Sequence, residues 1–258
     1  MNIKPQIKKI INKYWDQIYK YNQVIKNDSK NNDIKDYYSG SIITELYKQN
    51  NNFQILSLVL NTGGVSIYKS SQCSLWPIQF VLNILPPDIR YHRSNIIVAA
   101  LFYGQKKPDP MEYFLSLVNE FQSLQTEGFS MVINETFYKF KVLITHCILD
   151  LPAKAFIQQI SQYNAYEACT YCHHPGELII NEKSKIKFVL YTITKTEPLL
   201  RTHEETLKMM YKIGTSNNKN VKPIKGIKGV SCMVPFNNFD LINSFGIDYM
   251  HCVLLLTY

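Results

Sequence analysis

A single carboxylate, Asp150, stands where a long apolar run gives way to a helix-like segment. Acidic residues at the end of a buried strand often take part in chemistry, because the strand holds them rigidly and the following loop exposes them. Carboxylate oxygens are also the ligands that Mg²⁺ prefers. Asp150 is therefore a candidate catalytic residue. The alternative is that Asp150 only caps the helix that begins near Pro152, since Asp ahead of Pro is a standard helix start.

A second candidate for chemistry is the cysteine pair Cys169-x-x-Cys172. Two thiolates at this spacing on a turn can share one Zn²⁺, which takes four ligands in structural sites. The two remaining ligands could be His173 and His174, which follow at once, or could come from the distant segment Asp248–His251. The alternatives to a zinc site are a redox pair and a pair of inert thiols.

Three lysines, Lys222, Lys225 and Lys228, are spaced around two glycines in the last part of the chain. Lysines among glycines can reach phosphates while the backbone approaches closely, so we expect these residues to bind nucleic acid. The net charge of +8 favours the same anionic partner. The alternatives are a solvated loop for the lysines and a general bias toward Lys and Asn for the net charge.

The composition limits the classes of protein to which the chain can belong. Hydrophobic residues make up 46% and charged residues 19%, as in a globular protein with a sizeable core. The six cysteines are too few and too unevenly placed for a disulfide scaffold. Residues 1–5 lack the apolar core of a signal peptide, and no apolar run approaches the roughly 18 residues that span a membrane. We expect an intracellular protein without a membrane partner.

The spacing of hydrophobic residues predicts the elements that position these candidates. The expected helices cover residues 1–27, 110–127 and 152–163, and the expected strands cover residues 53–60, 65–69, 95–103 and 137–149. The first two strands are expected to form a hairpin through the turn at residues 61–64, and the third is expected to be central in the sheet. Residues 27–36 and 70–93 are expected to be mostly loop.

Three strands, a helix and a further strand, in that order, predict an α/β fold with helices packed on a mixed sheet. This is the order of the ribonuclease H-like fold. In that fold, acidic residues at the ends of the first and fourth strands bind two metal ions about 4 Å apart, which activate water or a 3′-hydroxyl. We divide the chain into a basic helical segment at residues 1–50, the sheet core at residues 51–165, and a zinc-binding insertion with the C-terminal part at residues 166–258.

The sequence resembles the transposase domain of the CACTA, or En/Spm-like, DNA transposons. The matching segments follow the order of that family and are Asn61–Val65, Trp76–Ile78, Leu85–Pro87, Phe102–Gly104 with Lys107–Pro108, Asp150–Ala155, Cys169–Cys172, Arg201–Thr202, Gly226–Gly229 and Asp248–His251. The resemblance implies a ribonuclease H-like domain with a catalytic triad of two Asp and one Glu. It implies cleavage and transfer of DNA strands with Mg²⁺, in the nucleus.

The resemblance also assigns roles to individual residues. Asp150 would be the second catalytic Asp, and Arg201 would be a DNA contact. Asp248 and His251 would complete a structural zinc site with the cysteine pair. Such a site would tie the insertion after Asp150 back onto the sheet.

Two departures from the family pattern bear on activity. The first catalytic Asp is expected in the turn after the first strand, where this chain has Gly63. The third acid is expected beyond residues 248–251, but the sequence ends at Tyr258 inside an apolar run. We therefore expect a partial, C-terminally truncated and degenerate transposase copy that is catalytically inactive. The alternatives are a domesticated zinc-containing DNA-binding or protein-interaction module without catalysis, and a relic that does not fold stably.

Overall fold

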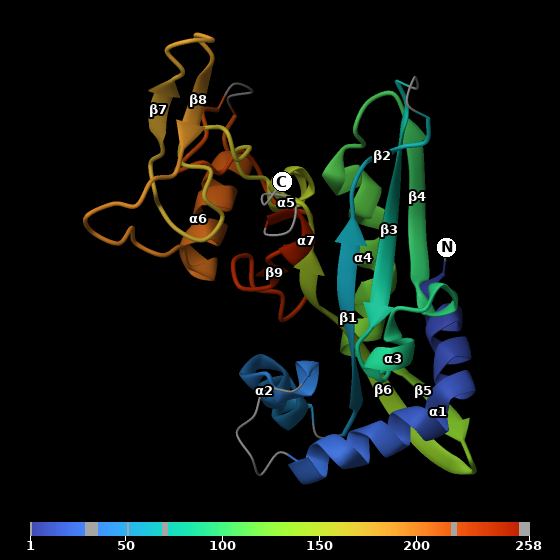
Figure 1. The fold of residues 1–258 in the computed structure, drawn as a ribbon. Helices are drawn as coiled ribbons and strands as arrows, with labels where there is room; N and C mark the ends of the chain where they lie inside the picture. The colour runs from blue at the N-terminus through green and yellow to red at the C-terminus, as the bar shows by residue number, and fades with distance from the viewer. Residues whose placement is uncertain (1, 29–35, 51, 69–71, 218–220, 253–258) are drawn as a thin grey trace.

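A computed structural model describes residues 2–28, 36–50, 52–68, 72–217 and 221–252, which form helices packed on a mixed sheet (Figure 1). The strands of the large sheet are β1 (Gln54–Thr62), β2 (Val65–Ser66), β3 (Ser74–Leu82), β4 (Ile97–Gly104), β5 (Phe129–Ile133), β6 (Thr136–Ile148) and β9 (Phe245–Gly246). A separate hairpin consists of β7 (Glu177–Ile180) and β8 (Lys187–Leu190). The helices are α1 (Ile3–Asp28), η1 (Tyr37–Ser39), α2 (Ser41–Gln49), α3 (Pro87–Arg90), η2 (Arg93–Asn95), α4 (Pro110–Thr126), α5 (Leu151–Gln158), α6 (His203–Gly214) and α7 (Tyr249–Cys252).

The sheet mixes parallel and antiparallel pairs. Four of its strands run in the order β4–β3–β1–β6, with β4 at the edge, and β9 lies beside the carboxyl end of β6. β3 is antiparallel to both β1 and β4, whereas β6 is parallel to both β1 and β9. β5 forms an antiparallel hairpin with the first half of β6. The carboxyl ends of β1, β6 and β9 therefore meet at one edge of the sheet.

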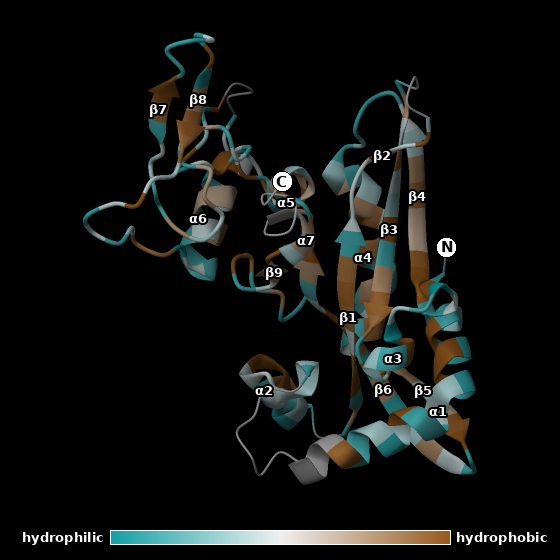
Figure 2. Cartoon of the chain, in the orientation of Figure 1, coloured by the Kyte–Doolittle hydropathy of each residue, from teal (hydrophilic) through white to brown (hydrophobic). Residues whose placement is uncertain are grey.

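The parallel pair β1–β6 is the centre of the core. Leu58 and Leu60 of β1 lie opposite Ile144 and Cys147 of β6, and all four side chains are buried. Helices cover both faces of this pair, which is why the two strands are nearly continuous apolar runs. Figure 2 shows the hydrophobic residues along β1 and the mixture of hydrophobic and hydrophilic residues on α1.

Helices α1 and α4 pack into the main core on one face of the sheet, as the sequence predicted. α1 buries Ile7, Ile11 and Ile18 completely in the same core as the strands. α4 begins where the sequence predicted a helix, after Asp109, whose Oδ1 accepts hydrogen bonds from two backbone nitrogens of the first turn at 2.9 and 3.1 Å. On the opposite face, α2 covers a smaller apolar cluster around Leu143.

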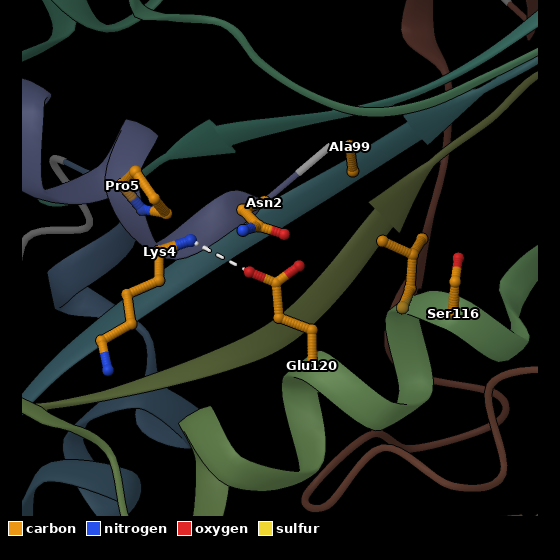
Figure 3. Close-up of a pocket in the computed structure, with 7 residues that line it drawn as sticks. Asn2, Lys4, Pro5, Ala99, Ser116 and Glu120 are labelled. Atoms are coloured by element: carbon orange, nitrogen blue, oxygen red, sulfur yellow. Dashed lines mark hydrogen bonds between the residues drawn. The ribbon is translucent and has the colours of Figure 1, made fainter.

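The N-terminus of α1 is capped by a residue of α4. The first turn of α1 contains no acidic residue. Oε1 of Glu120 instead accepts hydrogen bonds from the backbone nitrogens of Ile3 at 2.6 Å and Lys4 at 3.1 Å. Glu120 stands in the wall of a surface hollow that both helices line (Figure 3). A carboxylate at this end of a helix satisfies free N–H groups and offsets the helix dipole.

Three expectations for the early strands are wrong. First, β1 does not form the expected hairpin with residues 65–69, because its antiparallel partner is β3. Second, residues 70–93 were expected to be mostly loop, but they contain β3. β2 pairs with the start of β3 rather than with β1. β3 contains Pro77, which lies between the part of the strand that pairs with β1 and the part that pairs with β2. Because proline is unusual inside a strand, the hydrophobic pattern of the sequence did not predict β3. The expected loop at residues 27–36 lies largely outside the described residues.

The third wrong expectation is that β4 would be a central strand of the sheet. Within the described residues β4 pairs only with β3, so it lies at the edge of the sheet. Its second half exposes Leu101 and Tyr103 to solvent.

No helix in the described part of the chain has the length and apolar character needed to cross a membrane.

The junction between α4 and β5 depends on Gly128. Its φ is +72°, and a Cβ placed there would lie 2.0 Å from the carbonyl oxygen of Phe140. We expect Gly128→Ala to lower the free energy of unfolding by more than about 2 kcal/mol, because side chain and backbone strain add. Gly63→Ala is the matched control, since nothing lies within 4 Å of a Cβ at that position. Urea unfolding followed by circular dichroism measures both, and equal stabilities would contradict the close approach at Gly128.

Candidate functional site

Asp150 lies two residues after the end of β6 and caps α5. Its backbone is extended, and its Oδ1 accepts a hydrogen bond from the backbone nitrogen of Ala153 at 2.7 Å. The capping interpretation of this residue is therefore confirmed. Within the described residues, no hydrogen bond reaches the other oxygen, Oδ2. Because Oδ2 has no such partner and the side chain is only partly buried, the carboxylate can cap the helix and still offer one oxygen to a ligand.

Positions 63 and 150 lie at equal distances along the chain from the last paired residues of β1 and β6. Leu60 faces Cys147 in the parallel register of these strands, and Gly63 and Asp150 each follow three residues later. The two strand ends stay in contact here, because Nδ2 of Asn61 donates to the carbonyl oxygen of Ile148 at 2.8 Å. A Cβ at position 63 would meet nothing within 4 Å. The sheet thus presents two adjacent positions at its carboxyl edge, of which only one carries a carboxylate.

A packed aromatic pair supports this edge. A Cβ on Gly64 would lie 2.6 Å from the Trp76 indole, so only glycine allows the backbone to lie flat against that ring. Trp76 is buried, and its ring centroid lies 5.2 Å from that of Phe156 on α5. The Tyr113 hydroxyl donates to the carbonyl oxygen of Trp76. These contacts fix the end of β1 against α5, which holds position 63 and Asp150 in place.

The two cysteines of the predicted metal site lie together. Sγ of Cys169 is 3.3 Å from Sγ of Cys172, and both are free thiols. The turn that carries them is held by Arg201, whose Nε donates to the carbonyl oxygens of Cys169 at 2.9 Å and Cys172 at 3.1 Å. Its Nη2 donates to the carbonyl oxygen of Glu167 at 2.9 Å. The spacing of the pair is therefore fixed by hydrogen bonds and suits two ligands of one metal ion.

Arg201 is not placed to contact DNA, which corrects the role implied by the family resemblance. The side chain is 4% exposed, and its guanidinium is engaged with the carbonyl groups of the cysteine turn. Burial lowers the pKa of Arg201, while the nearby cysteines and Glu167 act in the opposite direction. The sequence shows that Arg201 is a cation, but it does not show that the fold buries this side chain.

The described residues do not complete the metal site. Nε2 of His174 donates to the carbonyl oxygen of Thr192 at 2.9 Å and its Nδ1 accepts from a backbone nitrogen, so both ring nitrogens are engaged. His173 bonds through Nε2 to Glu205 at 2.9 Å. No three His, Cys, Asp or Glu side chains among the described residues form a metal-binding group. Both ring nitrogens of His174 are thus engaged, whereas the buried Nδ1 of His173 has no hydrogen-bond partner among the described residues.

The distant ligand pair is only partly visible. Oδ1 of Asp248 accepts a hydrogen bond from the backbone nitrogen of Met250 at 3.1 Å, which places Asp248 at the start of α7. The side chain of His251 lies outside the described residues. The four-ligand set of Cys169, Cys172, Asp248 and His251 therefore stays a prediction.

The three predicted phosphate-binding lysines differ in their surroundings. Lys225 pairs with Glu205, at 2.8 Å between Nζ and Oε1. Hydrogen bonds from Lys225 and His173 lower the pKa of Glu205 to about 2. Lys222 is exposed and has no ion pair among the described residues. Lys228 lies beside the end of α5, and burial together with the charge of Lys107 lowers its pKa.

Lys154 is a structural residue of the site that sequence reasoning missed. It is 3% exposed, and its Nζ donates to the hydroxyl of Tyr171 at 2.7 Å and to the carbonyl oxygen of Phe245 at 3.4 Å. The Tyr171 hydroxyl donates to the same carbonyl at 2.8 Å. This lysine joins α5, the cysteine turn and β9. Its signal in the sequence is a single Lys inside the apolar segment that begins α5.

Comparison with known proteins gives one family. A family model described as "Protein of unknown function (DUF1258)" matches residues 1–194. The matched range contains Gly63, Asp150 and the cysteine pair, and it ends before Arg201 and the lysines around Lys228. No curated protein matches the chain.

Substitutions at Asp150 separate its two roles. Asn caps helices about as well as Asp, whereas Ala costs about 1 kcal/mol. We expect Asp150→Asn to keep the free energy of unfolding within about 0.5 kcal/mol and Asp150→Ala to lower it by about 1 kcal/mol. Both variants should lose Mn²⁺ binding, measured by water proton relaxation, because both remove the carboxylate.

Asp109 provides the matched control for this pair, since it caps α4 in the same way. Asp109→Ala should cost similar stability and leave Mn²⁺ binding unchanged. Retention of Mn²⁺ binding in Asp150→Asn would show that the carboxylate is not the ligand.

Proposed function

Because the chain belongs to the family described as protein of unknown function DUF1258, whose description assigns no activity, we propose a function from its site. The protein is a transposase-like, DNA-binding protein with a ribonuclease H-like sheet, acting in the nucleus, in which strand cleavage has been lost. The observation that carries this proposal is the parallel register of β1 and β6, in which Gly63 and Asp150 each follow three residues after the paired Leu60 and Cys147.

The order and directions of the strands support the proposal. Along the chain, β1, β3 and β4 form an antiparallel series, α4 crosses over, and β6 then lies parallel to β1. A ribonuclease H-like sheet has this order, with a fifth strand parallel to the fourth, as β9 is to β6. Two-metal phosphodiester chemistry in that fold uses acids at the ends of the first and fourth strands. Gly63 and Asp150 occupy these two ends.

The donor set explains why cleavage would be lost. Two ions about 4 Å apart need carboxylates on both sides of the pair. The first strand is followed by a glycine, so of positions 63 and 150 only Asp150 offers a hard oxygen ligand. Bound Mg²⁺ would activate a water or a 3′-hydroxyl and stabilise the leaving oxygen. A single carboxylate holds such an ion weakly, and DNA binding through the positive charge of the chain remains.

Restoring the missing acid tests the catalytic assignment. We expect Gly63→Asp to fold normally, because the position has open space, and to tighten Mn²⁺ binding at least about tenfold, because two adjacent carboxylates share the ion. Water proton relaxation measures the affinity. Plasmid nicking with Mn²⁺ tests in addition whether two acids suffice for cleavage.

Two controls accompany the repaired variant. Gly63→Asn has nearly the same shape without the charge and should bind Mn²⁺ as weakly as the native protein. Gly63→Asp combined with Asp150→Asn should lose the gain. If Gly63→Asp binds no better than Gly63→Asn, positions 63 and 150 do not form a metal pair and the catalytic assignment fails.

A second candidate function is a zinc-containing DNA-binding or protein-interaction module without catalysis. The observation that favours it is the separation of 3.3 Å between the sulfur atoms of Cys169 and Cys172, on a turn held by a buried arginine. The residues that would hold the ion are these two cysteines with Asp248 and His251. Zinc there would tie the cysteine turn to the segment that follows β9 and stabilise the fold.

Metal analysis tests this candidate. Purified native protein should contain about one Zn²⁺ per chain, and a chelator should lower its stability. Cys169→Ser with Cys172→Ser should abolish zinc binding, and His251→Ala should weaken it. Cys73→Ser, at another partly exposed cysteine, should leave the zinc content unchanged. Folded native protein without zinc would remove the site.

A further inference from the structure

Two lysines from distant parts of the chain are each connected to the aromatic pair of Trp76 and Phe156. Nζ of Lys107, in the loop before α4, lies 5.7 Å from the centroid of the Trp76 ring. The same ring lies against Gly64, directly after position 63. The buried Trp76 ring therefore links the end of β1 to Lys107.

Lys228 is connected to the same ring from the C-terminal part of the chain. Its backbone nitrogen donates to the carbonyl oxygen of Gln159 at 2.8 Å. Gln159 in turn donates through Nε2 to the carbonyl oxygen of Phe156, whose ring packs on Trp76. The Lys107 ammonium group and the backbone of Lys228 are thus each connected to one aromatic pair. The charge of Lys107 also lowers the pKa of Lys228.

The pair has no counter-charge of its own. Neither ammonium group forms an ion pair among the described residues. The acid nearest in sequence to Lys107 is Asp109, whose Oδ1 is engaged by two backbone nitrogens at the start of α4. Two adjacent cations repel each other, so an anion that bridges them is favoured. Lys225 differs, because Glu205 already neutralises it.

We propose that Lys107 and Lys228 together bind one backbone phosphate of a nucleic acid strand, next to the position of Asp150. This inference rests on the proposed function and adds to it the path of the strand along the carboxyl edge of the sheet. Lysine ammonium groups act as point charges with rotatable donors, so two of them can reach the two free oxygens of one phosphodiester. Such a contact positions the strand and carries no sequence preference.

The test measures binding of fluorescein-labelled duplex and single-stranded oligonucleotides by fluorescence anisotropy over a range of NaCl concentrations. Lys107→Gln with Lys228→Gln should weaken duplex binding about tenfold near 0.1 M salt and reduce the slope of log K against log salt by about 1, because one phosphate contact is lost. Lys107→Arg with Lys228→Arg should retain both affinity and slope. Circular dichroism and thermal unfolding verify that each variant is folded.

The matched control removes the same charge elsewhere. Lys9→Gln with Lys20→Gln changes two exposed lysines of α1, the helix that lies away from the carboxyl ends of β1 and β6 (Figure 1). If this control and Lys107→Gln with Lys228→Gln lose equal affinity and slope, the phosphate pair is overturned while DNA binding stands. If the native protein binds neither oligonucleotide, the proposed function fails and the inference fails with it.

A further arm separates nucleic acid from small phosphate compounds. Inorganic pyrophosphate is titrated into the native protein in a calorimeter. Binding of pyrophosphate that depends on Lys107 and Lys228, in the absence of oligonucleotide binding, would identify a free phosphate compound as the ligand and overturn the nucleic acid path.

Discussion

The parallel pairing of β1 with β6 is the constraint on which the rest of the structure depends. The two strands are separated by β3, β4 and α4 along the chain, and their pairing fixes where these elements can lie. β3 and β4 extend the sheet on one side, and α4 crosses one face to connect β4 with the β5–β6 hairpin. Parallel strands require such a crossover. The same pairing aligns the carboxyl ends of β1 and β6, so every feature of the candidate site follows from it.

Much of the secondary structure could be predicted where one periodicity dominates a segment. The buried stripe of α1, the Asp109 cap of α4 and the apolar length of β6 each have a single interpretation. The prediction failed where local signals compete with pairing at a distance. The two glycines after β1 are typical of a hairpin turn, but the partner of β1 is β3. Every second residue from Trp76 to Leu82 is buried in the sheet, and this burial outweighs the backbone hydrogen bond that Pro77 cannot donate. Edge and central strands also look alike in sequence when half of an edge strand is buried, as in β4.

The sequence predicted which residues of the candidate site lie close together along the chain, but it did not predict which of its side chains the fold buries. Two cysteines three residues apart come together because a turn brings them together, and an Asp before a helix caps it. Burial depends on the whole fold, so neither the enclosed Arg201 nor the enclosed Lys154 could be told from solvated basic residues. The connection of Lys107 and Lys228 to the pair of Trp76 and Phe156 follows from contacts among α5, β3 and two loops. No local pattern in the sequence contains that information.

The cap that Glu120 places on α1 has a consequence for the order of folding. α1 precedes the sheet and α4 along the chain, yet the carboxylate that satisfies its leading N–H groups is supplied by a residue 117 positions further along the chain. Its apolar stripe likewise has no surface to cover until the sheet exists. Isolated helices gain little stability without packing, so α1 emerges from the ribosome as a segment that cannot yet complete itself. We expect α1 to pack onto the sheet only after the sheet has formed from residues that are synthesised later.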